Sequence, residues 1–336
     1  MGGARELTAV FKGIAAFQHV PKIKNNPVFH SPFPVTLIII TLLFFLLQLT
    51  SCERKTATEG GISIIVSIPP QQWFVSQIAG DNIQITVLAG PGTNPHNFEP
   101  VPRQIQSLSS ADAWILSGAE FEISLLPKVK NLFPNLLIVD GTQGVKFRML
   151  EEHDHMFENN VSSETVTPGS PLPTPHLDRH TWLGREPAKI LASHVMDTLI
   201  LVDGDNEKFY RERYEGVIQL INNEFDLLKV TLAPLRGKNV FVYHPSFGYF
   251  LDEFGIHQEA VETGGKEPGP RQLSYLIEMI KEEQAAAVFV QTQFPVNAAK
   301  TVAASAGAQL VGLDPLAPDW LENIRRMGQA LMKAIP

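Results

Sequence analysis

Three histidines and one aspartate stand at positions where an α/β protein places its ligands, namely His96, His180, His244 and Asp314. His244 follows the apolar run 239–243, and Asp314 follows a second such run at 309–313. His96 comes after the run 83–88 and a glycine–proline turn, while His180 precedes a helical pattern. Open α/β sheets bind ligands outside the carboxyl ends of their strands, so these side chains are expected to face a shared crevice. Imidazole nitrogens with one carboxylate suit tetrahedral Zn²⁺, whereas Mg²⁺ and Ca²⁺ prefer oxygen ligands.

The elements that must position these residues alternate between strand and helix in two halves of the chain. The predicted strands are 62–67, 83–88, 113–116 and 136–139 in the first half, and 239–243, 258–261, 287–291 and 309–313 in the second. Such alternation implies parallel sheets. Between the halves, a long charged and amphipathic pattern from Asp205 to about Leu232 predicts one rigid helix. The predicted fold class is therefore α/β, with two lobes, each a mostly parallel sheet flanked by helices, joined by one long rigid helix.

The amino terminus has the layout of a secretory signal peptide. Basic residues precede an uncharged apolar run of 13 residues, Val35–Leu47, and Leu-Thr-Ser follows just before Cys52. The run is shorter than the ~20 residues of a membrane span, which favours a signal peptide over the alternative interpretation, an uncleaved anchor. The segment ending at Cys52 resembles the bacterial lipoprotein signal, in which the cysteine is lipidated. Cys52 is also the single cysteine of the chain, which excludes an intramolecular disulfide.

These features divide the chain into five predicted parts. They are a signal peptide with a lipoprotein-type cleavage site at 1–51, a tether at 52–60, an amino-terminal lobe at 61–204 with a proline-rich loop at 151–178, a connecting helix at 205–236 and a carboxy-terminal lobe at 237–336. The formal net charge of −8 argues against nucleic-acid binding, because no basic stripe is available to neutralise phosphates. We expect a monomer.

Four short segments carry a family resemblance. Residues 94–100, 178–183, 241–249 and 313–316 resemble, in order, the four metal-binding segments of the zinc/manganese substrate-binding proteins of ABC importers. The resemblance implies that the metal lies in the cleft between two lobes. It also implies an extracytoplasmic receptor of the cell envelope, lipid-anchored or periplasmic, whose partners are an ABC permease and its ATPase. Zinc is the expected ligand and manganese the alternative.

Other histidines and acidic residues receive weaker predictions. His153, His155 and His176 lie in the loop that is rich in histidine in zinc-specific members, and they form a candidate auxiliary metal site, with a solvated loop as the alternative. An aspartate before proline is also a common turn residue, so Asp314 is the weakest of the four ligands. His194, predicted within a helix, and His257, predicted in a loop, are assigned structural roles, and Glu267 is assigned to a helix start.

Two functions from other classes stay open at this stage. A zinc hydrolase would use three protein ligands and keep one position for water, although the sequence lacks a His-Glu-x-x-His segment and a Gly-x-Ser-x-Gly elbow. A surface adhesin is the third candidate. Four protein ligands would close the site and indicate capture, whereas three protein ligands with a bound water would indicate catalysis. For capture, protons compete with zinc for neutral imidazoles, so affinity is expected to fall from about pH 7 to 5, with one competing proton for each histidine if all three titrate normally.

Overall fold

The computed structural model describes residues 61–81, 83–150, 177–262, 269–293 and 297–334. The chain divides into two compact units, Met1–Thr58 and Glu59–Pro336, and the described residues all belong to the second. Both predicted lobes and the connecting helix therefore lie within one unit. Among the described residues, no helix is both long enough and apolar enough to span a membrane.

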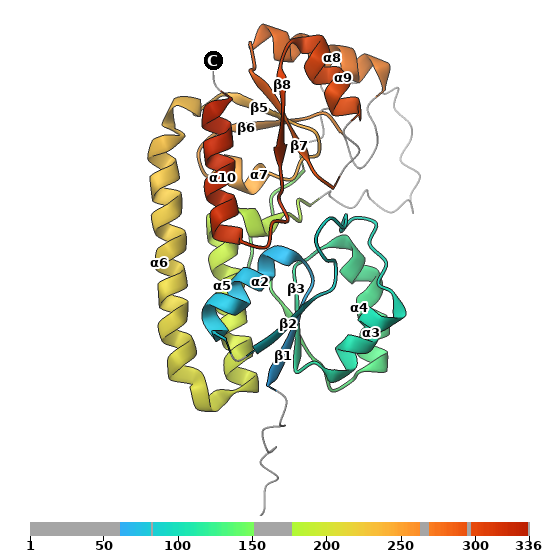
Figure 1. Ribbon diagram of the computed structural model, residues 1–336, viewed down its shortest axis with the longest axis vertical. Helices are drawn as coiled ribbons and strands as arrows, with labels where there is room; N and C mark the ends of the chain where they lie inside the picture. Colours follow the sequence, from blue (N-terminus) through green and yellow to red (C-terminus); the bar gives the residue numbers. More distant parts are fainter. Residues whose placement is uncertain (1–60, 82, 151–176, 263–268, 294–296, 335–336) are drawn as a thin grey trace, which may run out of the picture. The chain divides into compact units, whose positions relative to one another are not determined.

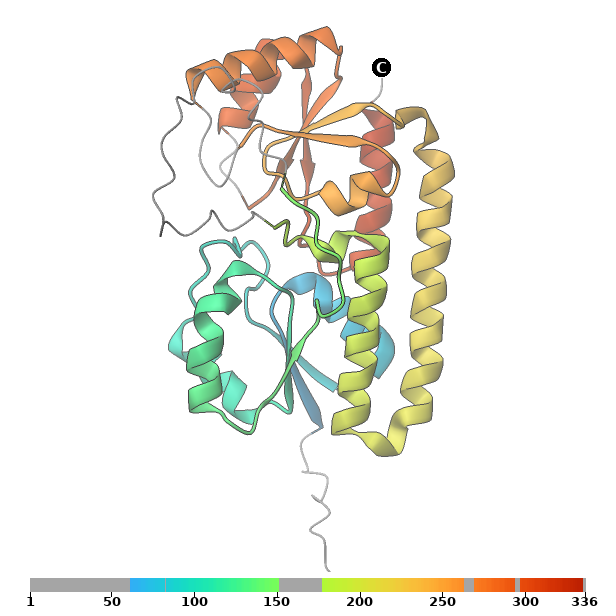
Figure 2. The same cartoon turned by 180° about the vertical axis from the view of Figure 1, so that it is seen from behind.

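The first half of the unit forms a parallel sheet of four strands in the order β2-β1-β3-β4 (Figure 1). The strands are β1 (Ile62–Val66), β2 (Ile83–Val87), β3 (Ala113–Leu116) and β4 (Leu137–Asp140). The helices around it are α2 (Pro69–Ala79), α3 (Pro102–Ser107), α4 (Glu120–Leu132) and α5 (Arg185–Val202). In both views α3 and α4 cover one face of the sheet, and α2 and α5 cover the other (Figures 1 and 2). Proline begins α2 and α3, where its missing N–H costs nothing.

The second half repeats this arrangement with strand order β6-β5-β7-β8. Its strands are β5 (Asn239–Val242), β6 (His257–Ala260), β7 (Ala287–Gln291) and β8 (Gln309–Leu313). Its helices are α7 (Gly248–Asp252), α8 (Pro270–Glu282), α9 (Asn297–Ala306) and α10 (Trp320–Lys333). Side chains alternate along β5: Val240 and Val242 join the core beneath α7 and α10, and Phe241 packs with the core beneath α8 and α9. The two cores lie on opposite faces of one sheet.

Helix α6 (Glu207–Thr231) connects the halves, with short 3₁₀ turns at 204–206 and 233–235 at its ends. Its buried stripe has helical spacing and includes Tyr210, Val217, Ile221, Phe225 and Leu228. Both views show α6 running beside α5 and α10 (Figures 1 and 2). This confirms the long helix predicted from the charged amphipathic pattern.

An aromatic cluster explains why the two halves form one unit. Trp320 of α10 lies with its ring centroid 4.8 Å from that of Phe74 on α2 and 6.4 Å from that of Phe225 on α6. Trp320 is also fully buried. The carboxy-terminal helix thus packs against α2 of the first half as well as against the second sheet. A shared core of this kind limits how far the halves can move apart.

Most predicted strands and helices agree with the structure to within a residue or two. The prediction for His257 is wrong, because this residue is the first of β6 and not part of a loop. It pairs in parallel register with Asn239 of β5 and its side chain is exposed. Because His257 is polar, the sequence pattern did not include it, and β6 begins one residue before the predicted strand at 258–261.

A close approach at the end of β4 gives a stability prediction. A Cβ atom on Gly141 would lie 2.5 Å from the carbonyl oxygen of Leu116 and 2.8 Å from Cδ1 of Leu191. Because the first contact is with backbone, we expect Gly141→Ala to lower the free energy of unfolding by about 1–3 kcal/mol in urea denaturation. The matched control is Gly216→Ala on α6, where nothing lies within 4 Å and helix propensity favours alanine by up to about 1 kcal/mol. Equal stability of the two variants would contradict this packing.

Candidate metal site

Three loops at the facing ends of the two halves carry the three predicted histidines. His96 lies in the loop after β2, where its backbone N–H donates to the side chain of Asn94 at 3.0 Å. His180 precedes the 3₁₀ turn that leads into α5. His244 follows β5 by two residues. The structure therefore brings together residues that the sequence separates by long intervals.

The three imidazoles face one another closely enough to hold one ion. One ring nitrogen from each lies within 4.8 Å of the others, and Nε2 of His96 is 2.9 Å from Nε2 of His244. The centroid of the His180 ring is 5.6 Å from that of His96 and 5.2 Å from that of His244. Two nitrogens bound at ~2.0–2.1 Å to a tetrahedral Zn²⁺ stand about 3.3 Å apart, so small shifts suffice to admit the ion.

Each histidine also has a carboxylate partner on its other ring nitrogen, Nδ1. The three pairs are His96 with Glu120 at 3.2 Å, His180 with Asp178 at 2.8 Å and His244 with Glu262 at 3.1 Å. A metal-bound histidine typically engages a carboxylate through the second nitrogen, which fixes the ring and raises its basicity as a ligand. The pairing leaves the Nε2 atoms of His96 and His244 directed at each other.

Burial and charge set the protonation of these groups. Burial lowers the pKa of His244 to about 4, and the charges of His180 and His96 act in the same direction against the opposing influence of Glu262. Burial raises the pKa of Glu120, but its hydrogen bond and charge interaction with His96 outweigh burial and bring the pKa to about 2. At neutral pH the site therefore combines a neutral His244 imidazole with an ionised Glu120 carboxylate.

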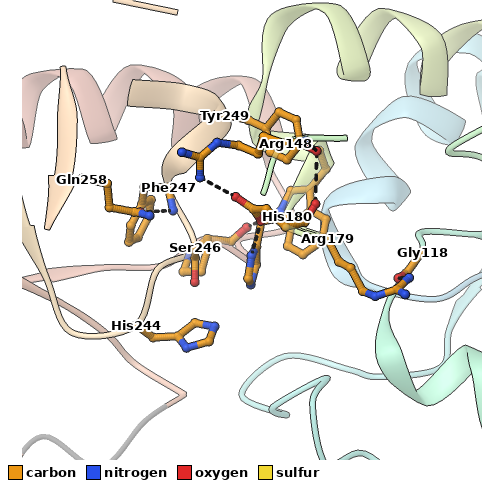
Figure 3. Close-up of polar contacts among 12 residues, drawn as sticks. Gly118, Arg148, Arg179, His180, His244, Ser246, Phe247, Tyr249 and Gln258 are labelled. Carbon is orange, nitrogen blue, oxygen red and sulfur yellow. Dashed lines mark hydrogen bonds and ion pairs between the residues drawn. The ribbon is translucent and has the colours of Figure 1, made fainter. Parts of the chain in front are cut away.

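The backbone around His244 is held by two buried glutamines. Gln291, at the end of the neighbouring strand β7, accepts from the backbone N–H of His244 at 3.3 Å and donates to its carbonyl oxygen. Gln258 of β6 accepts from the N–H of Phe247 at 2.8 Å (Figure 3). The turn after β5 is thus fixed on both sides, which preorganises the His244 ligand.

Asp314 does not join this group of three. Its carboxylate accepts from Nε2 of Gln293 at 2.6 Å and from the N–H of Leu316 at 2.9 Å. Leu316 belongs to the same turn after β8, whereas Gln293 follows the neighbouring strand β7 by two residues. Gln293, Pro315 and Leu316 line the cleft, so Asp314 stands close behind its wall. The four-ligand set stays a prediction, and ligation by Asp314 requires its side chain to leave Gln293.

The remaining predicted residues lie elsewhere. His194 is on α5, as predicted, and its Nε2 lies 2.8 Å from the carbonyl oxygen of Gln143. The candidate auxiliary ligands, the lipidation candidate and the predicted helix-start residue fall outside the described residues, namely His153, His155, His176, Cys52 and Glu267. The auxiliary site and the lipid anchor therefore stay predictions.

Sequence reasoning missed the three carboxylate partners, although each had a local signal. Asp178 stands two residues before His180, the spacing at which an aspartate also accepts from the backbone N–H of the histidine, here at 2.9 Å. Glu262 follows β6 by two residues, and Glu120 begins α4 just after β3. The signal that both share is an acidic residue within four residues after the end of a strand.

The space enclosed beside the histidines is small. The cleft lined by all three has a volume of about 20 Å³, against ~10–15 Å³ needed to hold one water. Its lining also includes Glu120, Arg179 and Ser246. Such a volume fits an ion with few waters and is far below the ~300–1,000 Å³ of pockets that usually bind organic molecules.

The fold and the histidine group together define a class: a binding protein of two α/β lobes with a histidine-lined cleft. A family model described as zinc-uptake complex component A, periplasmic (ZnuA), matches residues 64–334. A crystal structure of ZnuA superimposes with a TM-score of 0.71 at 32% identity, covering 82% of this chain and 99% of that chain. A ZnuA deletion mutant with zinc bound superimposes equally well, with a TM-score of 0.71 and 32% identity. This chain belongs to the ZnuA family.

Curated relatives extend the comparison to two metals. The zinc-binding lipoprotein AdcA of Streptococcus pneumoniae strain R6 is 22% identical over 283 residues, which cover 80% of this chain and 53% of AdcA. The manganese-binding lipoprotein MntA of Halalkalibacterium halodurans is 25% identical over 265 residues, covering 77% of this chain and 81% of MntA. The chain thus spans about half the length of the AdcA relatives that it matches.

Proposed function

We propose that this chain is an extracytoplasmic receptor that captures Zn²⁺ between its two lobes and delivers it to an ABC permease and its ATPase for import. The observation that carries the proposal is the group of three imidazoles, each backed by a carboxylate on Nδ1. Capture replaces the water shell of the ion with the imidazole nitrogens. Membership of the ZnuA family supports the same role.

Zinc is favoured over manganese by the donor set. Nitrogen-rich sites bind Zn²⁺ more tightly than Mn²⁺ in the usual affinity order, and Mn²⁺ prefers oxygen ligands. The manganese receptor remains the second candidate, because MntA covers most of this chain and Glu120 and Asp314 place carboxylates near the cleft. Elemental analysis of the purified protein, followed by competition between Zn²⁺ and Mn²⁺, decides between them. Tighter binding of Mn²⁺ would overturn the zinc proposal.

A zinc hydrolase is disfavoured by the same features. The cleft volume of about 20 Å³ is far below the ~300–1,000 Å³ of pockets that usually bind organic substrates, and the family model describes a component of an uptake complex. An adhesin role would need a surface that binds a partner, and the described residues give no evidence of one. These observations favour the receptor function over both alternatives.

We further propose Asp314 as the fourth ligand, and its effect is expected to be smaller than that of a histidine. Binding requires its carboxylate to exchange the amide of Gln293 for the ion, which offsets part of the gain. Asp314→Ala should weaken zinc affinity by about tenfold, ~1.4 kcal/mol, in a chelator competition assay. Gln293→Ala, which frees the carboxylate, should bind zinc at least as tightly as the unchanged protein. No loss in Asp314→Ala would assign the fourth position to water.

We propose that Cys52 is the lipidated first residue of the mature protein. The proposal rests on the signal-like segment before Cys52 and is supported by the lipoprotein relatives AdcA and MntA. Cys52→Ala should block lipidation and the coupled cleavage, so the variant should keep residues 1–51 and have the larger mass of the uncleaved, unlipidated chain. Mass spectrometry of the expressed chain tests both points. An unchanged mature mass in the variant would contradict lipidation.

A further inference from the structure

Arg148 lies outside the metal cleft but contacts both halves of the protein (Figure 3). It follows β4 in the first half, and its side chain is only 13% exposed. Nη1 donates to Oδ2 of Asp178 at 2.9 Å, and Nε donates to Oδ2 of Asp252, the last residue of α7, at 2.8 Å. A guanidinium can serve two carboxylates at once because its donors form a planar fork. One side chain thereby joins the segment before His180 to a helix of the second half.

Two neighbouring residues of α7, Gly248 and Tyr249, accommodate and bind Arg148. The hydroxyl of Tyr249 accepts from the N–H of Arg148 at 3.0 Å and donates to the carbonyl oxygen of Asp178 at 3.1 Å. A Cβ atom on Gly248 would lie 1.7 Å from Nη1 of Arg148, so only glycine leaves space for the guanidinium. The Tyr249 hydroxyl and the Arg148 guanidinium therefore each connect α7 to the segment that contains Asp178, through separate hydrogen bonds.

The contacts continue from Arg148 to the metal site through Asp178. This carboxylate is fully buried and divides its two oxygens: Oδ2 accepts from Arg148, while Oδ1 accepts from the N–H of His180 at 2.9 Å and pairs with its Nδ1 at 2.8 Å. A buried charge needs its partners to stay in place. The orientation of the His180 ring thus depends on Asp178, and that of Asp178 depends on Arg148.

We propose that Arg148 is a positioning residue that sets the imidazole of His180 for the metal, and that it does so only while α7 of the second half is in contact with it. Separation of α7 from Arg148 removes the bonds to Asp252 and Tyr249, loosens Asp178 and releases the His180 ring. The contact couples the arrangement of the two halves to metal affinity and supplies a route for release. The inference rests on the proposed function to the extent that His180 binds the metal.

The test is a double-mutant cycle between Arg148 and His180 on the full chain, with zinc affinity measured by chelator competition. Arg148→Gln should weaken binding by about 10–100-fold, the usual effect of losing a group that orients a metal ligand. In the His180→Ala background the same substitution should change affinity by less than about twofold, because the ring that it orients is gone. Equal losses in both backgrounds would overturn the proposal.

Arg185 provides a matched control. Its side chain is 17% exposed, forms an ion pair with Asp226 of α6 at 2.9 Å and lies 3.6 Å from Glu253, next to α7. Its polar contacts are with Asn222, Asp226 and Glu253, none of which is a histidine of the site or its carboxylate partner. Arg185→Gln should lower the melting temperature and leave zinc affinity within about twofold. Equal weakening of affinity by both arginine variants would show a general loss of structure and overturn the proposal.

Tyr249→Phe keeps the inference testable if Arg148→Gln does not fold. It removes only the bonds of the hydroxyl to Arg148 and Asp178. The variant should bind zinc about 3–10-fold more weakly, and this loss should disappear in the His180→Ala background. An unchanged affinity would overturn the proposal. If His180→Ala itself leaves affinity unchanged, the metal site fails; if His180→Ala weakens binding and the Arg148 and Tyr249 variants do not, only the positioning role fails.

Discussion

His180→Ala is expected to weaken zinc binding by about a hundredfold. Zinc sites formed by four protein ligands bind with ~10–16 kcal/mol, so each ligand contributes roughly 3 kcal/mol, or about two factors of ten. His180 is buried and its ring is oriented by Asp178, so no other described side chain can replace it without rearrangement. Chelator competition at neutral pH measures the loss directly.

His194→Ala is the control for this prediction. His194 lies on α5, the helix that follows the His180 segment, and its Nε2 contacts the carbonyl oxygen of Gln143 rather than the group of three. The variant should bind zinc as the unchanged protein does. A comparable loss of affinity in both variants would mean that α5, and not the His180 ring, determines binding.

Sequence alone predicted the parallel sheets and the three histidines because local signals specified them. Most of the strands are short apolar runs, with the polar β6 as the exception. Because strands and helices alternate, the strands are parallel and their carboxyl ends lie at the same edge of each sheet. Resemblance of the four short segments then selected three histidines that the structure brings together. The connecting helix was visible because its buried stripe has period 3.6 over 25 residues.

The parts that sequence did not predict depend on contacts between distant segments. No local pattern in α10 indicates that Trp320 packs against Phe74 of the first half. The bond between Arg148 and Asp252 joins residues that are 104 positions apart, and no spacing rule relates them. The turn at Asp314 is similar: its aspartate–proline pair predicts both a ligand and a turn, and only the bond to Gln293 shows how the carboxylate is held.

The pH dependence of binding differs from the expectation that each histidine contributes one competing proton. Burial lowers the pKa of His244 to about 4, against ~6.5 for a free imidazole. Between pH 7 and 5 the ring is therefore neutral in the folded, metal-free protein and has no proton for zinc to displace. The condition of that expectation, that all three histidines titrate normally, is not met for His244, because burial lowers its pKa and the sequence carries no measure of that burial.

We therefore expect His244→Gln to weaken zinc binding by about a hundredfold at pH 7 and by the same factor at pH 5. Glutamine keeps a hydrogen-bonding group near the buried Glu262, which alanine would leave without its histidine partner. Chelator competition at pH 7, 6 and 5 should give plots of the logarithm of zinc affinity against pH that are parallel for His244→Gln and the unchanged protein. A slope that differs by about one proton per metal would show that His244 titrates within this range.

The same lowered pKa predicts how acid affects the stability of the metal-free protein. As pH falls below ~6.5 the unfolded chain protonates the His244 imidazole, whereas the folded protein resists protonation until about pH 4, so folding loses free energy across this interval. For His244 alone the loss between pH 7 and 5 is about 2 kcal/mol. His244→Gln lacks this group. Between pH 7 and 5 the unfolding free energy of the variant should therefore fall by about 2 kcal/mol less than that of the unchanged protein.

Urea denaturation of both proteins at pH 7, 6 and 5, without metal, isolates the contribution of His244 because the other titrating groups are common to both. A constant difference across the three pH values would mean that the folded state protonates His244 as readily as the unfolded chain does, and the buried, neutral ligand described above would be incorrect.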